Sequence, residues 1–214
     1  MAHLVDGVLS APVLVTGAAI AATGLALSLR RLDQDQLPRT AMLSAAFFVV
    51  SLIQVPLAGT SVHLIMAGLL GILLGWLAIP AIFIGLLLQA VLFGVGGVTA
   101  LGVNLMIMAA PAIACHFVFE KLKGRIPVTV LGGLCGGLAV LMTALLVSAS
   151  LVASGPELVW PANLVLMGHL PALVLEVILT ATAVRFLAKV RPDLLGVTGA
   201  SADFETGREQ PALP

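Results

Sequence analysis

Residues 40–119 form a run of 80 positions without a single Asp, Glu, Lys or Arg. Such a run cannot form the surface of an ordinary soluble domain, in which about 25% of residues are charged. The whole chain is 60% hydrophobic and 9% charged, so we predict an integral membrane protein. The apolar residues are continuous and do not alternate at period two, which excludes a transmembrane β-barrel. The predicted fold class is therefore an all-α integral membrane protein.

The positive charges of the chain indicate its orientation in the membrane. All ten Lys and Arg residues fall in three clusters: Arg30, Arg31 and Arg39; Lys121, Lys123 and Arg125; and Arg185, Lys189, Arg191 and Arg208. Basic loops of membrane proteins face the cytoplasm, so all three clusters are expected there. The first apolar run, 8–29, ends at the first cluster, which places the N-terminus outside. No basic segment precedes this run and no small-residue cleavage site follows it, so we do not expect a removable signal peptide.

The uncharged run lies between two basic clusters and must therefore cross the membrane an even number of times. At about 1.5 Å per residue, its helices would extend about 120 Å, enough for four crossings of a core about 30 Å thick. We expect turns at Pro56 with 59–61, at Pro80 and at 94–97. Seven spans are predicted, near 8–29, 40–57, 62–79, 81–94, 99–119, 126–154 and 163–184. Residues 1–187 would form one transmembrane domain and 188–214 a short cytoplasmic tail.

Ionisable side chains at membrane depth are candidates for function because they are costly to bury there. His63 is predicted at the external end of its span, on the same side as His3. An imidazole beside a terminal amine and a backbone amide can close chelate rings on a metal cation. The two histidines are therefore candidate ligands, although a solvated terminus is the alternative for His3. His116 lies near the cytoplasmic end of its span, where we expect it to snorkel to the interface.

Two further patterns lie within the predicted spans. His169 and Glu176 are seven residues apart and share one face of the last span. They are predicted to form a polar seam that hydrogen-bonds neighbouring helices, with direct metal ligation as the alternative. Ala18, Ala22 and Ala26 recur at four-residue spacing, which lets another helix approach closely. That helix could belong to a docking partner or to the same bundle.

Cys115 and Cys135 lie in apolar runs. We expect both cysteines to be buried as small hydrophobic residues, and we assign them no redox role.

Four segments carry a resemblance to a known family. They are GTSVHL at 59–64, QAVLFG at 89–94, GGVTALGVN at 96–104, and the last span with His169, Glu176 and Thr180 followed by RPDLL at 191–195. Together they resemble the CbiM/NikM family, the cobalt and nickel substrate-binding membrane subunits of energy-coupling-factor transporters. The segments follow the family's order over nearly the whole chain.

The resemblance implies that the N-terminal segment folds into the bundle and binds one divalent ion through four nitrogens. The family starts with Met-His, whereas Ala2 precedes His3 here. Removal of Met1, which a small second residue permits, restores the family spacing. The implied ligands are then the Ala2 amine, the His3 amide nitrogen and imidazole, and the His63 imidazole. If Met1 is retained, its amine, two amides and the His3 imidazole would form a self-contained chelate without His63.

A planar field of four nitrogens suits Ni²⁺, and Co²⁺ follows just below it in intrinsic affinity. Asp6, Ser61, Asn104 and His169 are candidates for holding the loop and the imidazoles in place. Where relatives often carry a polar residue this chain has Val95, which argues against an additional ligand there. We expect no cofactor other than the transported ion.

The implied function is substrate capture for a Ni²⁺ or Co²⁺ importer in the cytoplasmic membrane of a bacterium or archaeon. No G-x-x-x-x-G-K-[ST] motif occurs, so ATP hydrolysis is expected in cytosolic partner subunits. Further expected partners are a transmembrane coupling subunit, a small accessory membrane protein and membrane lipid. The net charge of zero argues against nucleic acid.

Two other functions compete with metal capture. One is an intramembrane metal-dependent hydrolase that uses His63, His169 and Glu176, although no H-E-x-x-H motif is present. The other is a structural membrane subunit that binds no metal.

Overall fold

The computed structural model describes residues 4–57 and 60–197, with the backbone alone for 54–57 and 60–63. Its helices are α1 Ala11–Leu29, α2 Leu37–Ser51, α3 Ala67–Leu74, α4 Ala78–Phe93, α5 Leu101–Leu122, α6 Val128–Ser154, α7 Val159–Gly168 and α8 Leu170–Val190. Short 3-10 turns are η1 Gln34–Gln36, η2 Gly75–Leu77, η3 Pro156–Leu158 and η4 Pro192–Leu195. Strands β1 Gln54–Leu57 and β2 Thr60–His63 pair antiparallel. This hairpin departs from the purely helical prediction.

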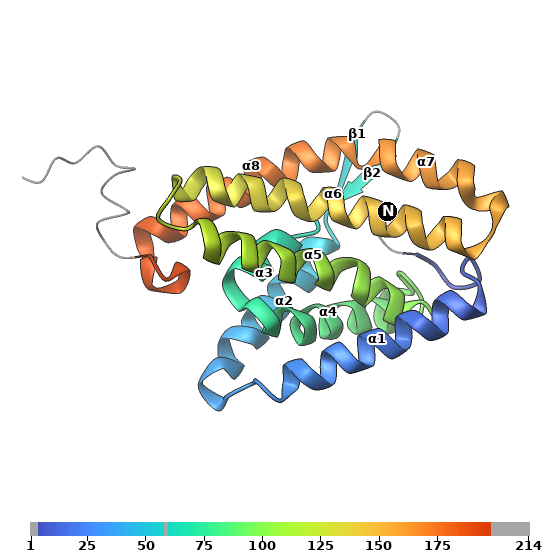
Figure 1. Cartoon of the computed structure of the whole chain (residues 1–214), viewed down its shortest axis with the longest axis horizontal. Helices are drawn as coiled ribbons and strands as arrows, with labels where there is room; N and C mark the ends of the chain where they lie inside the picture. Colours follow the sequence, from blue (N-terminus) through green and yellow to red (C-terminus); the bar gives the residue numbers. More distant parts are fainter. Residues whose placement is uncertain (1–3, 58–59, 198–214) are drawn as a thin grey trace, which may run out of the picture.

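The long helices lie roughly along one axis, with α1 on one side of the bundle and α6, α7 and α8 on the other (Figure 1). Helix α6 packs along α8, and α5 contacts α6, α3, α1 and α4. Five stretches of the described chain are long and apolar enough to cross a membrane: Ala11–Leu29, Ala67–Phe93, Leu101–Leu122, Val128–Ser154 and Pro156–Val190. The protein is therefore a multi-pass membrane protein. The predicted number of seven spans and their orientation stay predictions.

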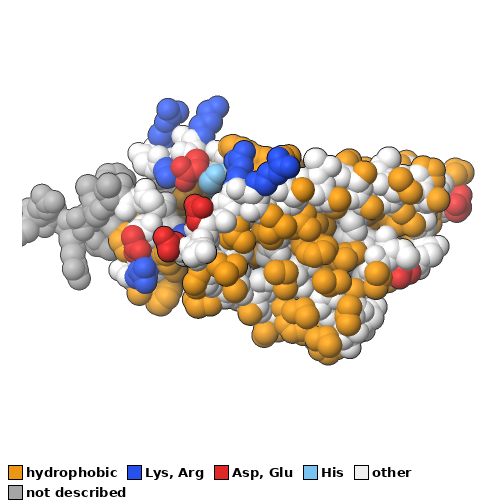
Figure 2. Space-filling view, turned by 90° about the horizontal axis from the view of Figure 1, so that it is seen from below, with side chains coloured by type: hydrophobic (Ala, Val, Ile, Leu, Met, Phe, Trp, Pro, Cys, Tyr) orange, Lys and Arg blue, Asp and Glu red, His pale blue; other side chains and the backbone are white. Residues whose placement is uncertain are grey.

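The basic clusters, which are far apart in the sequence, meet at one end of the bundle. The Arg39 guanidinium donates a hydrogen bond of 3.1 Å to the Leu194 carbonyl. Lys123 from the second cluster lies beside Gly196. Figure 2 shows Lys and Arg side chains gathered toward the left part of one face, while hydrophobic side chains are spread over the rest of that face. The positive-inside rule predicts such a concentration of basic residues at the cytoplasmic end of a membrane protein.

The predicted spans 40–57 and 62–79 are wrong in extent. Helix α2 ends at Ser51, the hairpin replaces helix on both sides of its turn, and α3 has only eight residues. The following turn is at Gly75, whose φ of +55° suits glycine, and a Cβ there would lie 3.0 Å from the His116 ring. Pro80 instead lies in the first turn of α4, where its missing N–H has no helical partner to lose.

The other spans are confirmed as helices with shifted ends, except the last one. The predicted turn at 94–97 is present, and Gly94 caps α4 with φ +66°. The single predicted span 163–184 consists of α7 and α8, which meet at His169. Pro171 in the first turn of α8 cannot donate to the preceding turn, so the helix is interrupted there. Helix α8 continues to Val190, and the domain boundary predicted at 187 stays a prediction.

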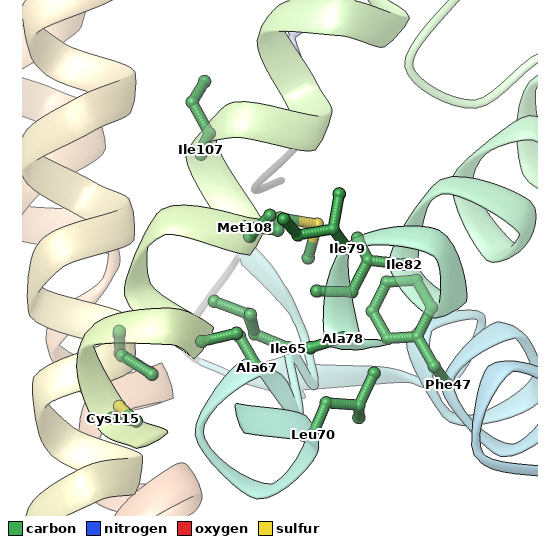
Figure 3. Close-up of a cluster of buried hydrophobic side chains, with 14 of the residues drawn as sticks. Phe47, Ile65, Ala67, Leu70, Ala78, Ile79, Ile82, Ile107, Met108 and Cys115 are labelled. Carbon is green, nitrogen blue, oxygen red and sulfur yellow. The ribbon is translucent and has the colours of Figure 1, made fainter. Parts of the chain in front are cut away.

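The core lies where α2, α3, α4 and α5 meet. Figure 3 shows Phe47, Ile65, Ile82 and Met108 among the buried side chains of this region. Glycines allow the close approach: a Cβ at Gly85 would overlap the Phe47 ring. The buried Cys115 thiol donates to the Cys135 carbonyl at 3.1 Å across α5 and α6. Both cysteines are buried in the bundle, as predicted.

Candidate metal centre

The N-terminal segment is attached to α5 through one asparagine. The Leu4 N–H donates to Asn104 Oδ1 at 2.8 Å, and Asn104 Nδ2 donates to the Leu4 carbonyl at 2.9 Å. The same amide reaches the Gly96 carbonyl at 3.3 Å. Asn104 is 2% exposed and Leu4 is 7% exposed. The side chain therefore pairs with Leu4 as a strand edge would, and it holds the residue that follows His3.

Asp6 makes a second attachment at the N-terminal end of α5. Its Oδ2 accepts the Val98 N–H at 3.1 Å, and its Oδ1 accepts the N–H groups of Thr99 and Ala100 at 3.0 and 3.1 Å. The Thr99 hydroxyl also donates to Oδ1. Amides at a helix start favour an anion. The Thr99 hydroxyl bond, helped by these amides, lowers the pKa of Asp6 despite some desolvation.

Gly97 makes this attachment possible. It has φ +76°, and a Cβ on it would overlap the Asp6 carboxylate. The GGVTALGVN segment at 96–104 thus supplies the glycine, the amides, the Thr99 hydroxyl and Asn104 that together bind the N-terminal segment. Asp6 and Asn104 are predicted from the sequence to hold this segment, whereas Thr99 and Gly97 are not predicted individually, because the sequence marks them only as members of the 96–104 segment.

Glu176 of α8 holds the exit of the β-hairpin. Its Oε1 accepts the N–H groups of Ile65 and Met66, the latter at 2.9 Å, and the side chain is 2% exposed. Met66 has φ +50°, a left-handed conformation that is uncommon outside glycine. The carboxylate therefore stabilises a sharp junction between β2 and α3. His63, the last residue of β2, pairs with Gln54 and precedes this junction by two residues.

His169 lies at the break between α7 and α8 and is 9% exposed. Its Nδ1 lies 2.7 Å from the Val165 carbonyl, which requires a proton on Nδ1. In the neutral ring, Nε2 then carries a lone pair that can accept a hydrogen bond or bind a metal. His169 and Glu176 are both buried, and the single polar face predicted for them stays a prediction.

The predicted ligands Ala2 and His3 and the side chains of His63 and Ser61 lie outside the described residues. Among the side chains that the structure describes, at 4–53 and 64–197, no three of His, Cys, Asp or Glu form a group that could hold a metal. The donor set therefore stays a prediction. The structure defines two supports: one on α5, which binds the N-terminal segment, and one on α8, which binds the exit of the hairpin.

The small residues of α1 contact α5 on one side of the helix and are exposed on another. Backbone contact with α5 occurs at Gly17 and Ala18, because a Cβ on Gly17 would overlap Val103 and one on Gly102 would lie 2.6 Å from the Ala18 Cα. The side chains of Ala18, Ala22 and Ala26 are themselves exposed. A docking role for these alanines stays a prediction.

The apolar helices and the buried polar supports define a multi-pass membrane protein built to hold its own N-terminal segment. Residues 3–194 match the CbiM family model, described as the cobalt uptake substrate-specific transmembrane region. The chain belongs to this family, a family of cobalt and nickel transport membrane proteins.

Individual relatives agree with this assignment. The chain is 40% identical over 204 residues to a Haemophilus influenzae protein named provisionally as a metal transport protein, covering 92% of this chain and 98% of that one. It is 39% identical over 113 residues to a fused nickel transport protein of Rhodobacter capsulatus, covering 50% of this chain and 33% of that one. A crystal structure of a transition metal transporter superposes with a TM-score of 0.77 at 25% identity, covering 95% of this chain and 97% of that chain.

Proposed function

We propose that this protein is the substrate-capture subunit of an importer for Ni²⁺ or Co²⁺, with residues 1–187 as its metal-binding transmembrane domain. The observation that carries the proposal is the buried pairing of Leu4 with Asn104. Successive α-carbons are about 3.8 Å apart, so the backbone of His3 has to start from this anchored point. An N-terminal segment held in this way suits a ligand donor better than a frayed terminus.

The donor chemistry follows from the residues next to the two supports. Ala2 would contribute its amine, His3 its amide nitrogen and imidazole, and His63 its imidazole. Deprotonated amide and neutral imidazole nitrogens form a strong field that favours Ni²⁺, with Co²⁺ just below it. Asp6, Asn104 and Glu176 would act by holding the ligand segments, as residues behind metal ligands commonly do. The transported ion is the substrate, and the proposal includes no resident cofactor.

Energy for import would come from other subunits. The proposed partners are a transmembrane coupling subunit and cytosolic ATPases, in an energy-coupling-factor assembly in the cytoplasmic membrane of a bacterium or archaeon. A small accessory membrane protein is a further proposed partner. The relative from Rhodobacter capsulatus is named as a fused protein, which supports a multi-subunit arrangement.

The hydrolase alternative finds no support in the described residues. Oε1 of Glu176 is engaged by two backbone N–H groups, and the Nδ1 of His169 is bound to a carbonyl. Neither arrangement resembles an activated nucleophile with its base.

Calorimetric titration with Ni²⁺ and Co²⁺ tests the proposed function. His3→Ala and His63→Ala should each abolish high-affinity binding while the protein remains folded. His116→Ala is the matched control, because this histidine lies beside Gly75 at the other end of α3, and it should bind as the wild type does. Unchanged affinity in both test variants would refute the site.

The N-terminus itself can be tested separately. Mass measurement of the purified protein should show that Met1 is removed. An intact Met1 would rule out the ligand set that begins with Ala2.

A further inference from the structure

Helices α1 and α5 pack closely near their N-terminal ends and leave a groove between them nearer the basic end of the bundle. The contact is at Gly17 and Ala18 against Val103 and Gly102. Beyond it lies a groove of about 550 Å³, whose lining includes Ala21, Gly24, Leu27, Trp76, Ala109 and Ile113. The Thr23 hydroxyl in this lining already donates to the Ala19 carbonyl at 2.8 Å. The groove therefore presents apolar surface to whatever fills it.

A positive charge lies beside the groove at its basic end. The Arg31 guanidinium carbon is 4.8 Å from the centroid of the Trp76 ring, and Trp76 itself lines the groove. The Ser28 hydroxyl donates to the Trp76 carbonyl at 2.6 Å, which fixes this turn against α1. Ion pairs in the described part of the chain join Lys123 to Glu120 and Arg191 to Asp193, so none of them neutralises Arg31. Tryptophan with an arginine is typical of the membrane–water interface.

We propose that this groove binds an anionic phospholipid, with an acyl chain between α1 and α5 and the phosphate at Arg31. The groove offers apolar surface for the chain and one positive charge for the headgroup, which matches the two parts of such a lipid. Basic pockets between transmembrane helices on the cytoplasmic side recognise anionic headgroups in this way. The hydrophobic surface beside the basic side chains in Figure 2 agrees with a lipid-facing position.

The chemistry of the groove and of the charge beside it favours a lipid over a helix of another protein. The lining on α1 runs over residues 19–27 and is apolar, and the Arg31 guanidinium lies over the Trp76 ring at the basic end. An anionic phospholipid carries an apolar chain and a negative headgroup in one molecule, which fits both features.

Fluorescence quenching by brominated lipids tests the site in the full chain. The chain has two tryptophans, so Trp160→Phe leaves Trp76 as the only reporter. The protein is reconstituted into two sets of phosphatidylcholine vesicles. One set contains brominated phosphatidylglycerol, and the other contains the same fraction of brominated phosphatidylcholine. Quenching of Trp76 by brominated phosphatidylglycerol should correspond to about five-fold enrichment of this lipid over phosphatidylcholine at the groove. This factor is the preference that one basic side chain gives for an anionic lipid.

Matched variants separate the headgroup from the chain. Arg31→Gln should remove the preference for phosphatidylglycerol, whereas Arg185→Gln, outside the groove, should keep it. Gly24→Leu should lower quenching by both lipids, because a Cβ there meets only Ile79 at ordinary contact distance and the side chain fills the groove. Ala22→Leu, on the exposed face of α1, should not lower it.

Three results would overturn the proposal. The first is an equal preference for phosphatidylglycerol at Trp160, measured in Trp76→Phe, and the second is a preference at Trp76 that survives Arg31→Gln. The third would come from a photoreactive residue placed at Ile113 in native membranes. We expect it to label lipid, and a protein adduct in its place would show that another chain occupies the groove.

Discussion

At the residue scale, three polar side chains bind main-chain groups of neighbouring segments. None of the three is among the proposed metal ligands. Asn104 and Asp6 bind the N-terminal segment to α5, and Glu176 binds the hairpin exit to α8. Each bond goes to main-chain groups that would otherwise lack a partner in a bilayer. The polar seam predicted for α8 therefore has a specific task at Glu176.

Substitutions of Glu176 distinguish a positioning role of this carboxylate from direct ligation of the metal. Glu176→Gln keeps an oxygen that can accept both N–H groups, so metal affinity should fall little. Glu176→Ala removes the acceptor and should lower affinity by about 10–100-fold, as loss of groups behind metal ligands commonly does. Calorimetric titration measures both variants. If Glu176→Gln alone eliminates binding, the carboxylate is a ligand.

Asp6 gives a similar prediction at the other support. Asp6→Ala should weaken Ni²⁺ binding by about 10–100-fold without changing the absorption spectrum of the bound ion. Asp193→Ala is the control, because this carboxylate pairs with Arg191 on the exposed end. A changed spectrum in Asp6→Ala would mean that the carboxylate touches the metal.

The pH dependence of metal binding should not come from Asp6. The pKa of Asp6 in the folded protein is lowered from the ordinary value of 3.8. The ionised carboxylate therefore stabilises the fold at every pH above 3.8, and this stabilisation is lost only as the pH falls through the lower pKa of the folded protein. Imidazole and amine ligands gain protons between about pH 5 and pH 8. Affinity should therefore decline over that range with the same midpoint in wild type and Asp6→Asn. A midpoint shifted in Asp6→Asn would contradict this.

At the element scale, short and irregular segments lie where regular helices were predicted. The hairpin and the eight-residue α3 bring backbone N–H groups into the bundle, and Glu176 satisfies two of them. The close contacts of α1 with α5 and of α3 with α5 use glycines, since a Cβ on Gly71 would overlap Ala112. Helices in a bilayer associate mainly through such packing.

Substitutions on the two faces of α1 should therefore differ. Gly17→Leu places a side chain against Val103 and should destabilise the protein by about 1–3 kcal/mol, seen as a lower Tm in detergent. Ala22→Leu on the exposed face should leave the Tm unchanged. If the exposed alanines dock a partner, Ala22→Leu should nevertheless reduce co-purification of the coupling subunit, and normal co-purification would argue against docking there.

At the scale of the whole molecule, the two supports stand on different helices that α6 joins. Helix α6 packs against both α5 and α8, so closely at Gly136 that a Cβ there would overlap the Glu176 carbonyl. The basic clusters meet at the opposite end of the long axis from the turn at η3 (Figure 1). This arrangement predicts one outer and one cytoplasmic end.

Thiol labelling in intact cells checks that orientation. The native cysteines are buried, so they should not react with a membrane-impermeant reagent. Glu157→Cys, in η3, should be labelled from outside, whereas Lys123→Cys in the basic loop should be labelled only after the cells are opened. The reverse pattern would invert the topology.

The sequence by itself determined the membrane class, the basic end and most helices, because these depend on hydrophobic length and charge, which are local properties. Asn104 and Glu176 lie in the segments that carry the family resemblance, and Asp6 is likewise a candidate from the sequence alone. Only the tertiary structure decided what they hold, because their partners lie about a hundred positions away in the chain. The hairpin likewise depends on packing and backbone hydrogen bonds, which override a uniformly apolar pattern. The break at His169, in contrast, follows from Pro171, a local feature of the sequence.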